Sequence, residues 1–208
     1  MRQHWIITCL VLTLLAGPAL ADEQEQKQKV AEDKAEVLEQ KAAQKDKPPP
    51  APAPKSEAIT QSEVQAVDPA GVAPMDDAIT CLARSIYWEA KGKEAADMEA
   101  VANVVMNRLG KEGFPDTVCG IVKQGSETKS CQFSWWCDGK SDSVQEEAPY
   151  AMAKEIARKA LNKQLPDRTG GALYFHDRTV HPDWAKEYIN TVDIGLFRFY
   201  KPKGGDAK

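Results

Sequence analysis

The sequence contains no apolar run long enough to form a membrane-spanning helix. Its longest run, from Trp5 to Leu15, has 11 residues, whereas a helix needs about 20 residues to cross a bilayer. A strong charge of either sign is also absent, because 27 basic and 31 acidic side chains leave a net charge of −4. This balance argues against general nucleic-acid binding, which requires clustered positive charge.

Metal-ligand spacing is absent as well. Cys131 and Cys137 are separated by five residues, which differs from the two to four residues of a usual zinc knuckle. Adding His176 or His181 produces no cluster with ligand spacing. We therefore expect neither a bound metal nor a cofactor.

The N-terminus has the features of an export signal. Arg2 precedes the apolar run, Gly17-Pro18 ends it, and Ala19-Leu20-Ala21 forms a small-x-small cleavage site. We predict a signal peptide over residues 1–21 that is cleaved after Ala21, and a mature protein in the periplasm or cell envelope. The alternative is that the segment is retained as an anchor.

Removal of this segment leaves four cysteines. An even number in an exported chain favours two disulfides. The spacing leaves all three pairings open among Cys81, Cys119, Cys131 and Cys137.

Residues 22–74 differ from the rest in composition. The part from 22 to 68 has 11 acidic and 7 basic side chains, and Val30, Val37 and Leu38 are too sparse for a heptad seam. A proline-rich run over residues 48–54 favours extended polyproline II geometry. We therefore expect a charged and Pro-rich spacer, disordered or partly helical, which either extends the reach of the following domain or has no role.

Residues 75–208 carry the patterns of a folded domain. Apolar residues recur with helical periodicity over residues 77–90, 94–109 and 148–162. Asp76 or Asp77 can cap the first of these helices. In the third we expect a buried face of Met152, Ile156, Ala160 and Leu161. Aromatic segments at 172–175 and 196–200 favour two strands, so the fold class is α+β with helices dominant.

Glu89 is the main candidate for catalysis. It lies near the end of the first helix, at the edge of the face that Ile86 and Ala90 bury. A carboxyl at an apolar edge is disfavoured in its charged form, so its pKa can rise. A raised pKa is what a general acid needs near neutral pH.

Five sequence blocks, taken in order, resemble the SleB-type cell-wall hydrolase family, named for the spore-cortex lytic enzyme. They are CLARSIYWEAKGKE (81–94), AVANVVMNRL (100–109), FPDTVC (114–119), CQFSW (131–135) and GGALYFH (170–176). The resemblance covers about residues 77–200. One departure is Lys91, where the family more often has arginine, which has a planar fork that lysine lacks.

The resemblance implies a lysozyme-like domain that cuts peptidoglycan. Glu89 falls in the block that carries the family's catalytic glutamate. The implied reaction is lytic transglycosylation between N-acetylmuramic acid and N-acetylglucosamine. No second acid occurs in a matched block, but Asp138 and Asp142 are near, and simple hydrolysis becomes the better hypothesis if either faces Glu89.

Further residues are candidates for the substrate groove. Aromatic faces stack on sugar rings and amides bind hydroxyl or N-acetyl groups; the candidates are Gln132, Phe133, Ser134, Trp135, Tyr174 and His176. Tyr174 and His176 alternate along a strand and should share a face. Asn107 and Arg108 are expected to brace the helical hairpin, and Trp184 to be packing.

Two other functions stay open. The domain can be a peptidoglycan-binding module without turnover. It can also be another envelope hydrolase, an amidase or a cysteine peptidase that uses Cys131 or Cys137 with His176. Peptidoglycan is the expected partner, an unidentified envelope regulator is a second, and we expect a monomer.

Overall fold

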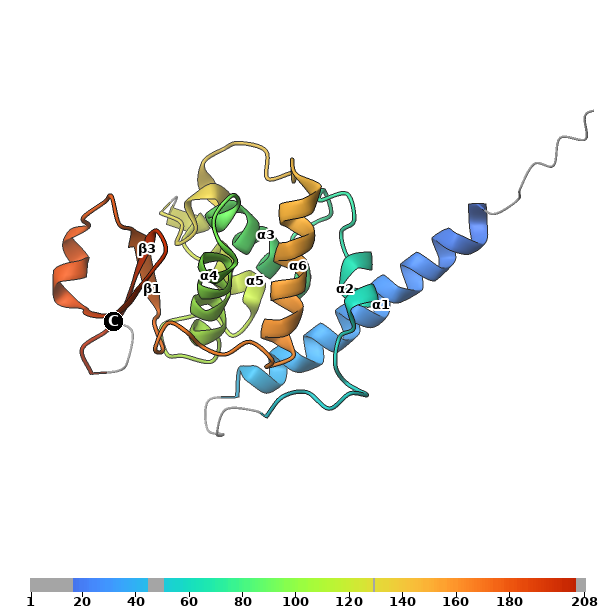
Figure 1. The fold of residues 1–208 in the computed structure, drawn as a ribbon, viewed down its shortest axis with the longest axis horizontal. Coiled ribbons are helices and arrows are strands. Elements are labelled where there is room, and N and C mark those ends of the chain that lie inside the picture. Colours follow the sequence, from blue (N-terminus) through green and yellow to red (C-terminus); the bar gives the residue numbers. More distant parts are fainter. Residues whose placement is uncertain (1–16, 45–50, 129, 205–208) are drawn as a thin grey trace, which may run out of the picture.

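The computed structural model describes residues 17–44, 51–128 and 130–204, and helices dominate it (Figure 1). The helices are α1 (Gly17–Ala42), α2 (Gln61–Ala66), α3 (Ala78–Ala90), α4 (Ala95–Arg108), α5 (Val118–Lys123) and α6 (Glu147–Leu161). Three short 3-10 turns are η1 (Ser126–Thr128), η2 (Ser134–Cys137) and η3 (Asp183–Glu187). The strands are β1 (Tyr174–Asp177), β2 (Ile189–Ile194) and β3 (Phe197–Lys201). The predicted fold class, mainly helical with a small sheet, is confirmed.

Helix α3 lies at the centre of the helical body and packs against α4, α5 and α6. Its N-cap is Asp77, whose carboxylate accepts a hydrogen bond of 2.8 Å from the Thr80 amide. Helix α4 follows after a short turn, and Gly110 closes it with φ +73°. A Cβ at Gly110 would lie 2.6 Å from the carbonyl oxygen of Ala43, so this position also sets how closely the end of α1 approaches.

The three strands form an antiparallel sheet in the order β1-β3-β2. The sheet lies at the end of the molecule opposite the projecting part of α1 (Figure 1). Strands β1 and β3 correspond to the two predicted strands, displaced by one or two residues. Strand β2 was not predicted, because most of its side chains are polar or exposed and give no clear alternation.

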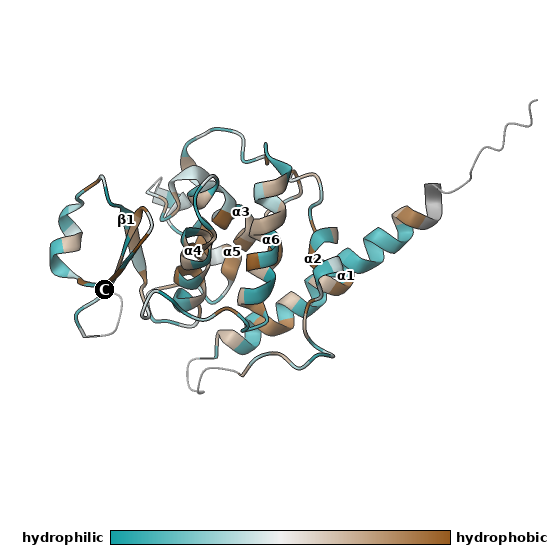
Figure 2. Cartoon of the chain, in the orientation of Figure 1, coloured by the Kyte–Doolittle hydropathy of each residue, from teal (hydrophilic) through white to brown (hydrophobic). Residues whose placement is uncertain are grey.

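The prediction that residues 22–74 form a spacer outside the domain is wrong for the part that packs. Helix α1 contacts α2, α3 and α6, and it buries Ala31, Ala35 and Leu38. These positions follow i, i+4 and i+7 and so form one helix face. Val30 and Val37 are exposed, so the buried face depends on small alanines that let helices approach closely. The remaining faces of α1 are mostly hydrophilic (Figure 2).

The segment between α1 and α3 also belongs to the core. Ile59 is 1% exposed; its amide donates to the side chain of Asn162, and its carbonyl accepts from the same side chain, both at 2.9 Å. Val64 of α2 is fully buried, and Asp68 is 2% exposed. The compact unit therefore extends well before residue 75.

The third predicted helix is confirmed as α6, but one of its predicted core residues is wrong. Met152 is 49% exposed, whereas Ile156, Ala160 and Leu161 are buried as expected. Tyr150 and Ala153 contribute to the buried face instead, because that face is rotated away from position 152.

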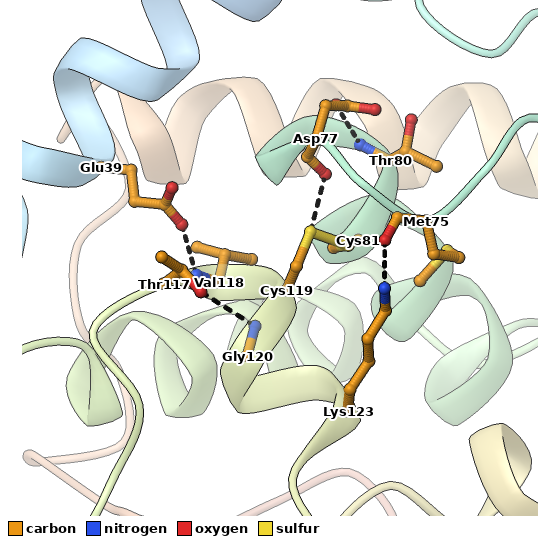
Figure 3. Close-up of a disulfide and its surroundings, with 10 residues drawn as sticks. All are labelled: Glu39, Met75, Asp77, Thr80, Cys81, Thr117, Val118, Cys119, Gly120 and Lys123. Carbon is orange, nitrogen blue, oxygen red and sulfur yellow. Dashed lines mark hydrogen bonds between the residues drawn. A yellow bond between two sulfur atoms is a disulfide. The ribbon is translucent and has the colours of Figure 1, made fainter. Parts of the chain in front are cut away.

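The four cysteines form two disulfides, Cys81–Cys119 and Cys131–Cys137. The first joins α3 to α5, and Figure 3 shows the polar contacts around it. The Glu39 carboxylate of α1 accepts a hydrogen bond from the Val118 amide at the start of α5, and burial raises the pKa of this carboxyl. Helix α1 thus docks beside the disulfide.

The predicted signal peptide lies mainly in residues 1–16, outside the described residues. Among the helices of residues 17–204 that are described, none is long and apolar enough to cross a membrane.

Candidate active site

A cleft of about 680 Å³ lies between the end of α3, the end of α4, the loop closed by the Cys131–Cys137 disulfide, and β1. Glu89, in the last turn of α3, is half-buried in its wall. The other residues that line it are Lys93, Arg108, Ser130, Cys131, Gln132, Ser134, Tyr174, Phe175, His176, Asp177, Trp184, Tyr188 and Phe197.

Burial raises the pKa of the Glu89 carboxyl to about 7. The positive charges of Arg108 and Lys93 act in the opposite direction, so desolvation is the larger effect. Both protonation states of Glu89 are therefore populated near neutral pH, as a group that donates and then recovers a proton requires.

Arg108 lies beside Glu89 in the cleft wall and is only 2% exposed. Its Nε–H donates to the Leu173 carbonyl at 2.8 Å, and Nη2 donates to Gln132 Oε1 at 3.4 Å. Arg108 therefore belongs to the cleft rather than to the helical hairpin alone. Asn107 has a structural role, but at a different place from the expected helical hairpin: its amide donates to Thr169 and to the Ala172 carbonyl and so holds the turn before β1.

Aromatic rings form part of the cleft wall. The Trp184 ring centroid lies 5.9 Å from that of Tyr174, 5.6 Å from that of His176 and 5.6 Å from that of Tyr188. Trp184 comes from η3 and was predicted to be packing, but it lines the cleft. Such a wall offers faces and edges on which a sugar ring can stack.

Four of the six predicted groove residues line the cleft, namely Gln132, Ser134, Tyr174 and His176. Tyr174 and His176 both contact the Trp184 ring, so they lie on the same face of β1, as predicted. The imidazole of His176 is held at both nitrogens, by the Asp177 carbonyl at 2.8 Å and the Tyr200 hydroxyl at 3.0 Å.

Phe133 and Trp135 do not line the cleft. Phe133 is 1% exposed and packs under the guanidinium of Arg108. Trp135 stacks on Trp88 with ring centroids 6.5 Å apart. It borders a second hollow of about 330 Å³ on the other side of Ser134.

Asp138 and Asp142 border that second hollow and do not line the cleft of Glu89. The carboxylate that does is Asp177, which the motif analysis missed because it follows directly after the last matched block. Its Oδ1 accepts hydrogen bonds from the amide and hydroxyl of Thr179, at 2.9 and 2.8 Å. These hydrogen bonds lower the pKa of Asp177, so this carboxyl is ionised where Glu89 is half protonated.

Lys91 takes no part in the cleft. Its ammonium lies 4.6 Å from the Trp88 ring centroid and 3.3 Å from a Glu146 oxygen. Lys91 therefore contacts Trp88 and Glu146 and is not among the residues that line the cleft of Glu89.

The cysteines and acids bear on two further chemistries, a cysteine nucleophile and a metal-dependent reaction. Cys131 and Cys137 are bonded to each other, so neither is a free thiolate nucleophile. No group of three His, Cys, Asp or Glu side chains within the described ranges could hold a metal ion.

The fold and cleft define a class of enzyme-like site, in which a carboxyl with a raised pKa shares a cleft with a group of aromatic rings. Residues 92–200 match the Cell Wall Hydrolase family, and the chain belongs to that family. The match begins at Gly92, just after the helix that carries Glu89.

The chain is similar to two spore cortex-lytic enzymes. The one from Halalkalibacterium halodurans is 30% identical over 132 residues, which are 62% of this chain and 36% of that protein. The one from Bacillus subtilis is 28% identical over 147 residues, which are 68% and 43%. The chain thus spans about two fifths of the length of these relatives.

Among solved structures, the catalytic domain of the Bacillus cereus SleB protein is 28% identical to this chain. The comparison covers 59% of this chain and 88% of that domain, with a TM-score of 0.48.

Proposed function

We propose that the protein cleaves peptidoglycan glycan strands between N-acetylmuramic acid and N-acetylglucosamine, as a lytic transglycosylase with Glu89 as general acid and base. The observation that carries this proposal is a single carboxyl with a pKa of about 7 in a cleft with an aromatic wall. Membership of the Cell Wall Hydrolase family supports the choice of substrate.

The reaction needs only one carboxyl that changes role. Protonated Glu89 donates its proton to the glycosidic oxygen, and the bond between that oxygen and the muramic acid anomeric carbon breaks. The Glu89 carboxylate then accepts the proton of the C6 hydroxyl of the same sugar while O6 bonds to the anomeric carbon. The products are a 1,6-anhydro sugar and a free 4-hydroxyl group, and Glu89 has recovered its proton.

Asp177 supports a second candidate, hydrolysis by two carboxyls. An ionised carboxylate in the same cleft as a protonated one is the usual arrangement of glycosidases. We favour transglycosylation because Asp177 Oδ1 is occupied by Thr179 and Oδ2 lies 3.8 Å from the ammonium of Lys93.

The substrate also sets where the enzyme acts. Since peptidoglycan lies outside the cytoplasmic membrane, we propose that the predicted export signal delivers the protein to the periplasm or cell envelope. The spore role of the relatives is not part of the proposal, because nothing in this chain points to sporulation.

The test is digestion of purified sacculi by the full chain, followed by mass spectrometry of the soluble products. We expect 1,6-anhydromuropeptides from the wild type and a loss of about 100-fold or more in rate for Glu89→Gln. Glu94→Gln is the matched control, because Glu94 is exposed and makes no side-chain cap hydrogen bond. It should cleave like the wild type.

Other products would identify the alternatives. Reducing ends, with Asp177→Asn as damaging as Glu89→Gln, would establish two-carboxyl hydrolysis. Free stem peptides would indicate an amidase, and sacculi that bind the protein but stay intact would indicate a binding module. Full activity of Glu89→Gln would refute the proposal in any form.

A further inference from the structure

Arg108 is a buried cation, and the proposed reaction, as described above, gives it no role. It lines the cleft with Glu89 and is 2% exposed. Nη1 has no hydrogen-bond partner among the described residues. Burial of an unpaired charge costs free energy. The hydrogen bonds of Arg108 in this structure do not offset that cost fully, which indicates a role for the guanidinium in the reaction.

The guanidinium is held in a fixed orientation. Its Nε and Nη2 are bound to Leu173 and Gln132. Its central carbon lies 5.1 Å from the ring centroid of Phe114 and 5.3 Å from that of Phe133. The Tyr174 ring centroid is a third, at 5.6 Å. Two hydrogen bonds and three rings therefore hold the planar guanidinium, and Nη1 is its donor without a partner among the described residues.

We propose that Arg108 is the positioning residue of Glu89: its guanidinium stabilises the carboxylate that remains when Glu89 has given its proton to the leaving sugar, and holds it for the return of the proton. This inference rests on the proposed role of Glu89 as general acid. A preorganised cation aimed at a site where negative charge develops stabilises the transition state without reorganisation at the moment of reaction.

The other ionisable groups around Glu89 do not replace Arg108. They come from the turn after α3, from β1 and from the segment after η3, and are Lys93, Tyr174, His176, Asp177 and Tyr188. Lys93 is the other cation of the cleft, but its ammonium lies near Asp177 and over the Phe197 ring at 4.8 Å. Arg108 shares the cleft with Glu89 and forms no ion pair of 4 Å or less with any carboxylate of the described residues, Glu89 included, so no other acid neutralises its charge.

The test compares the full chain with Arg108→Gln, which removes the charge, and Arg108→Lys, which keeps it without the planar fork. The pKa of Glu89 is measured by NMR with ¹³C-labelled glutamate and assigned with Glu89→Gln. The rate on sacculi is measured against pH. For Arg108→Gln we expect the pKa of Glu89 and the alkaline limb of the rate profile to rise by about one unit, and the maximal rate to fall about tenfold. Arg108→Lys should keep the pKa and lose part of the rate.

Asn107→Ala is the control for a purely structural effect. It loosens the turn before β1 through the neighbouring residue and leaves the charge of Arg108 in place. If Arg108→Gln moves the pKa of Glu89 and the alkaline limb no further than Asn107→Ala does, the proposal is wrong.

A measurement on the wild type decides the matter if Arg108→Gln does not fold. The ¹⁵Nε resonance of Arg108 should titrate with the pKa of Glu89 and should stay flat in Glu89→Gln. A flat response in the wild type would overturn the inference. Activity that survives Glu89→Gln would instead refute the proposed function, so the two failures are distinguishable.

Discussion

Asp68 and Arg84 form a buried ion pair, with Oδ2 of Asp68 accepting hydrogen bonds from Nε and Nη2 of Arg84 at 2.9 and 2.6 Å. The same oxygen accepts from the Tyr150 hydroxyl at 2.7 Å. One carboxylate thus joins the segment before the predicted domain to α3 and α6.

Loss of the charge on Asp68 should destabilise the whole domain. Asp68→Asn keeps the size of the side chain but leaves the Arg84 guanidinium buried without a counter-charge. We expect the free energy of unfolding to fall by about 3 kcal/mol, measured by urea denaturation. Asp76→Asn, an exposed site nearby, is the control and should change little. Equal midpoints for the two variants would contradict this role.

Deletion of the residues before 75 tests the extent of the domain directly. A chain that begins at residue 75 lacks the contacts of Ile59, Val64 and Asp68 with the core. It should give poorly dispersed amide spectra or aggregate, whereas a chain that begins at residue 22 should fold. A well-folded 75–208 fragment with full thermal stability would restore the expectation of a separate spacer.

The sequence predicted best what local chemistry determines. The cap of α3, left open between Asp76 and Asp77, and the apolar stripes of α3 and α4 are short-range features; both are found, with Asp77 as the cap. The face of α1 was missed because Ala31 and Ala35 carry little hydrophobic signal, and only the tertiary structure brings a partner to them.

The candidate site shows the same division between features that are local in sequence and features that only tertiary structure creates. Glu89 lines the cleft, and the motif that led to it is contiguous along one helix turn. Trp135 borders the second hollow and not the cleft, because an aromatic residue type alone does not reveal which surface its ring will meet. Arg108 and Trp184 come from distant segments that only folding brings to Glu89.

The raised pKa of Glu89 should make stability depend on pH. The folded carboxyl has a pKa of about 7, against 4.5 for its ordinary value, so the folded state binds more protons between these pH values. Stability should therefore fall as pH rises from about 4.5 to 7, by about 3 kcal/mol. Urea denaturation at pH 5 and pH 8 should show this decline in the wild type and a smaller one in Glu89→Gln. An identical pH dependence in both proteins would show that Glu89 is not its source.

Removal of the Trp184 ring should weaken substrate binding more than chemistry. Trp184 lines the cleft from η3 and is far from the Glu89 helix in sequence. We expect Trp184→Ala to raise the sacculus concentration for half-maximal rate about tenfold, the effect of one lost aromatic contact, with a smaller change in the maximal rate. Trp136→Ala is the control, because Trp136 bonds to Ser126 outside the cleft. Equal effects of both variants would contradict a binding role for Trp184.

Gly195 should be intolerant of any side chain because two constraints meet there. Its φ is +50°, and an added Cβ would overlap the carboxylate of Asp97, which also accepts a hydrogen bond from the Leu196 amide at 3.0 Å. The β2–β3 turn is thereby fixed to the start of α4. Gly195→Ala should lower the free energy of unfolding by about 3 kcal/mol.

The control is Gly171→Ala. Gly171 has a similar positive φ of +75°, with nothing within 4 Å of an added Cβ, so this variant reports backbone strain alone and should lower the free energy of unfolding by about 1 kcal/mol. The difference between the two variants measures the clash with Asp97, and it should disappear when Asp97→Ala is combined with each; a difference that survives in the double variants would mean that Asp97 does not anchor the turn.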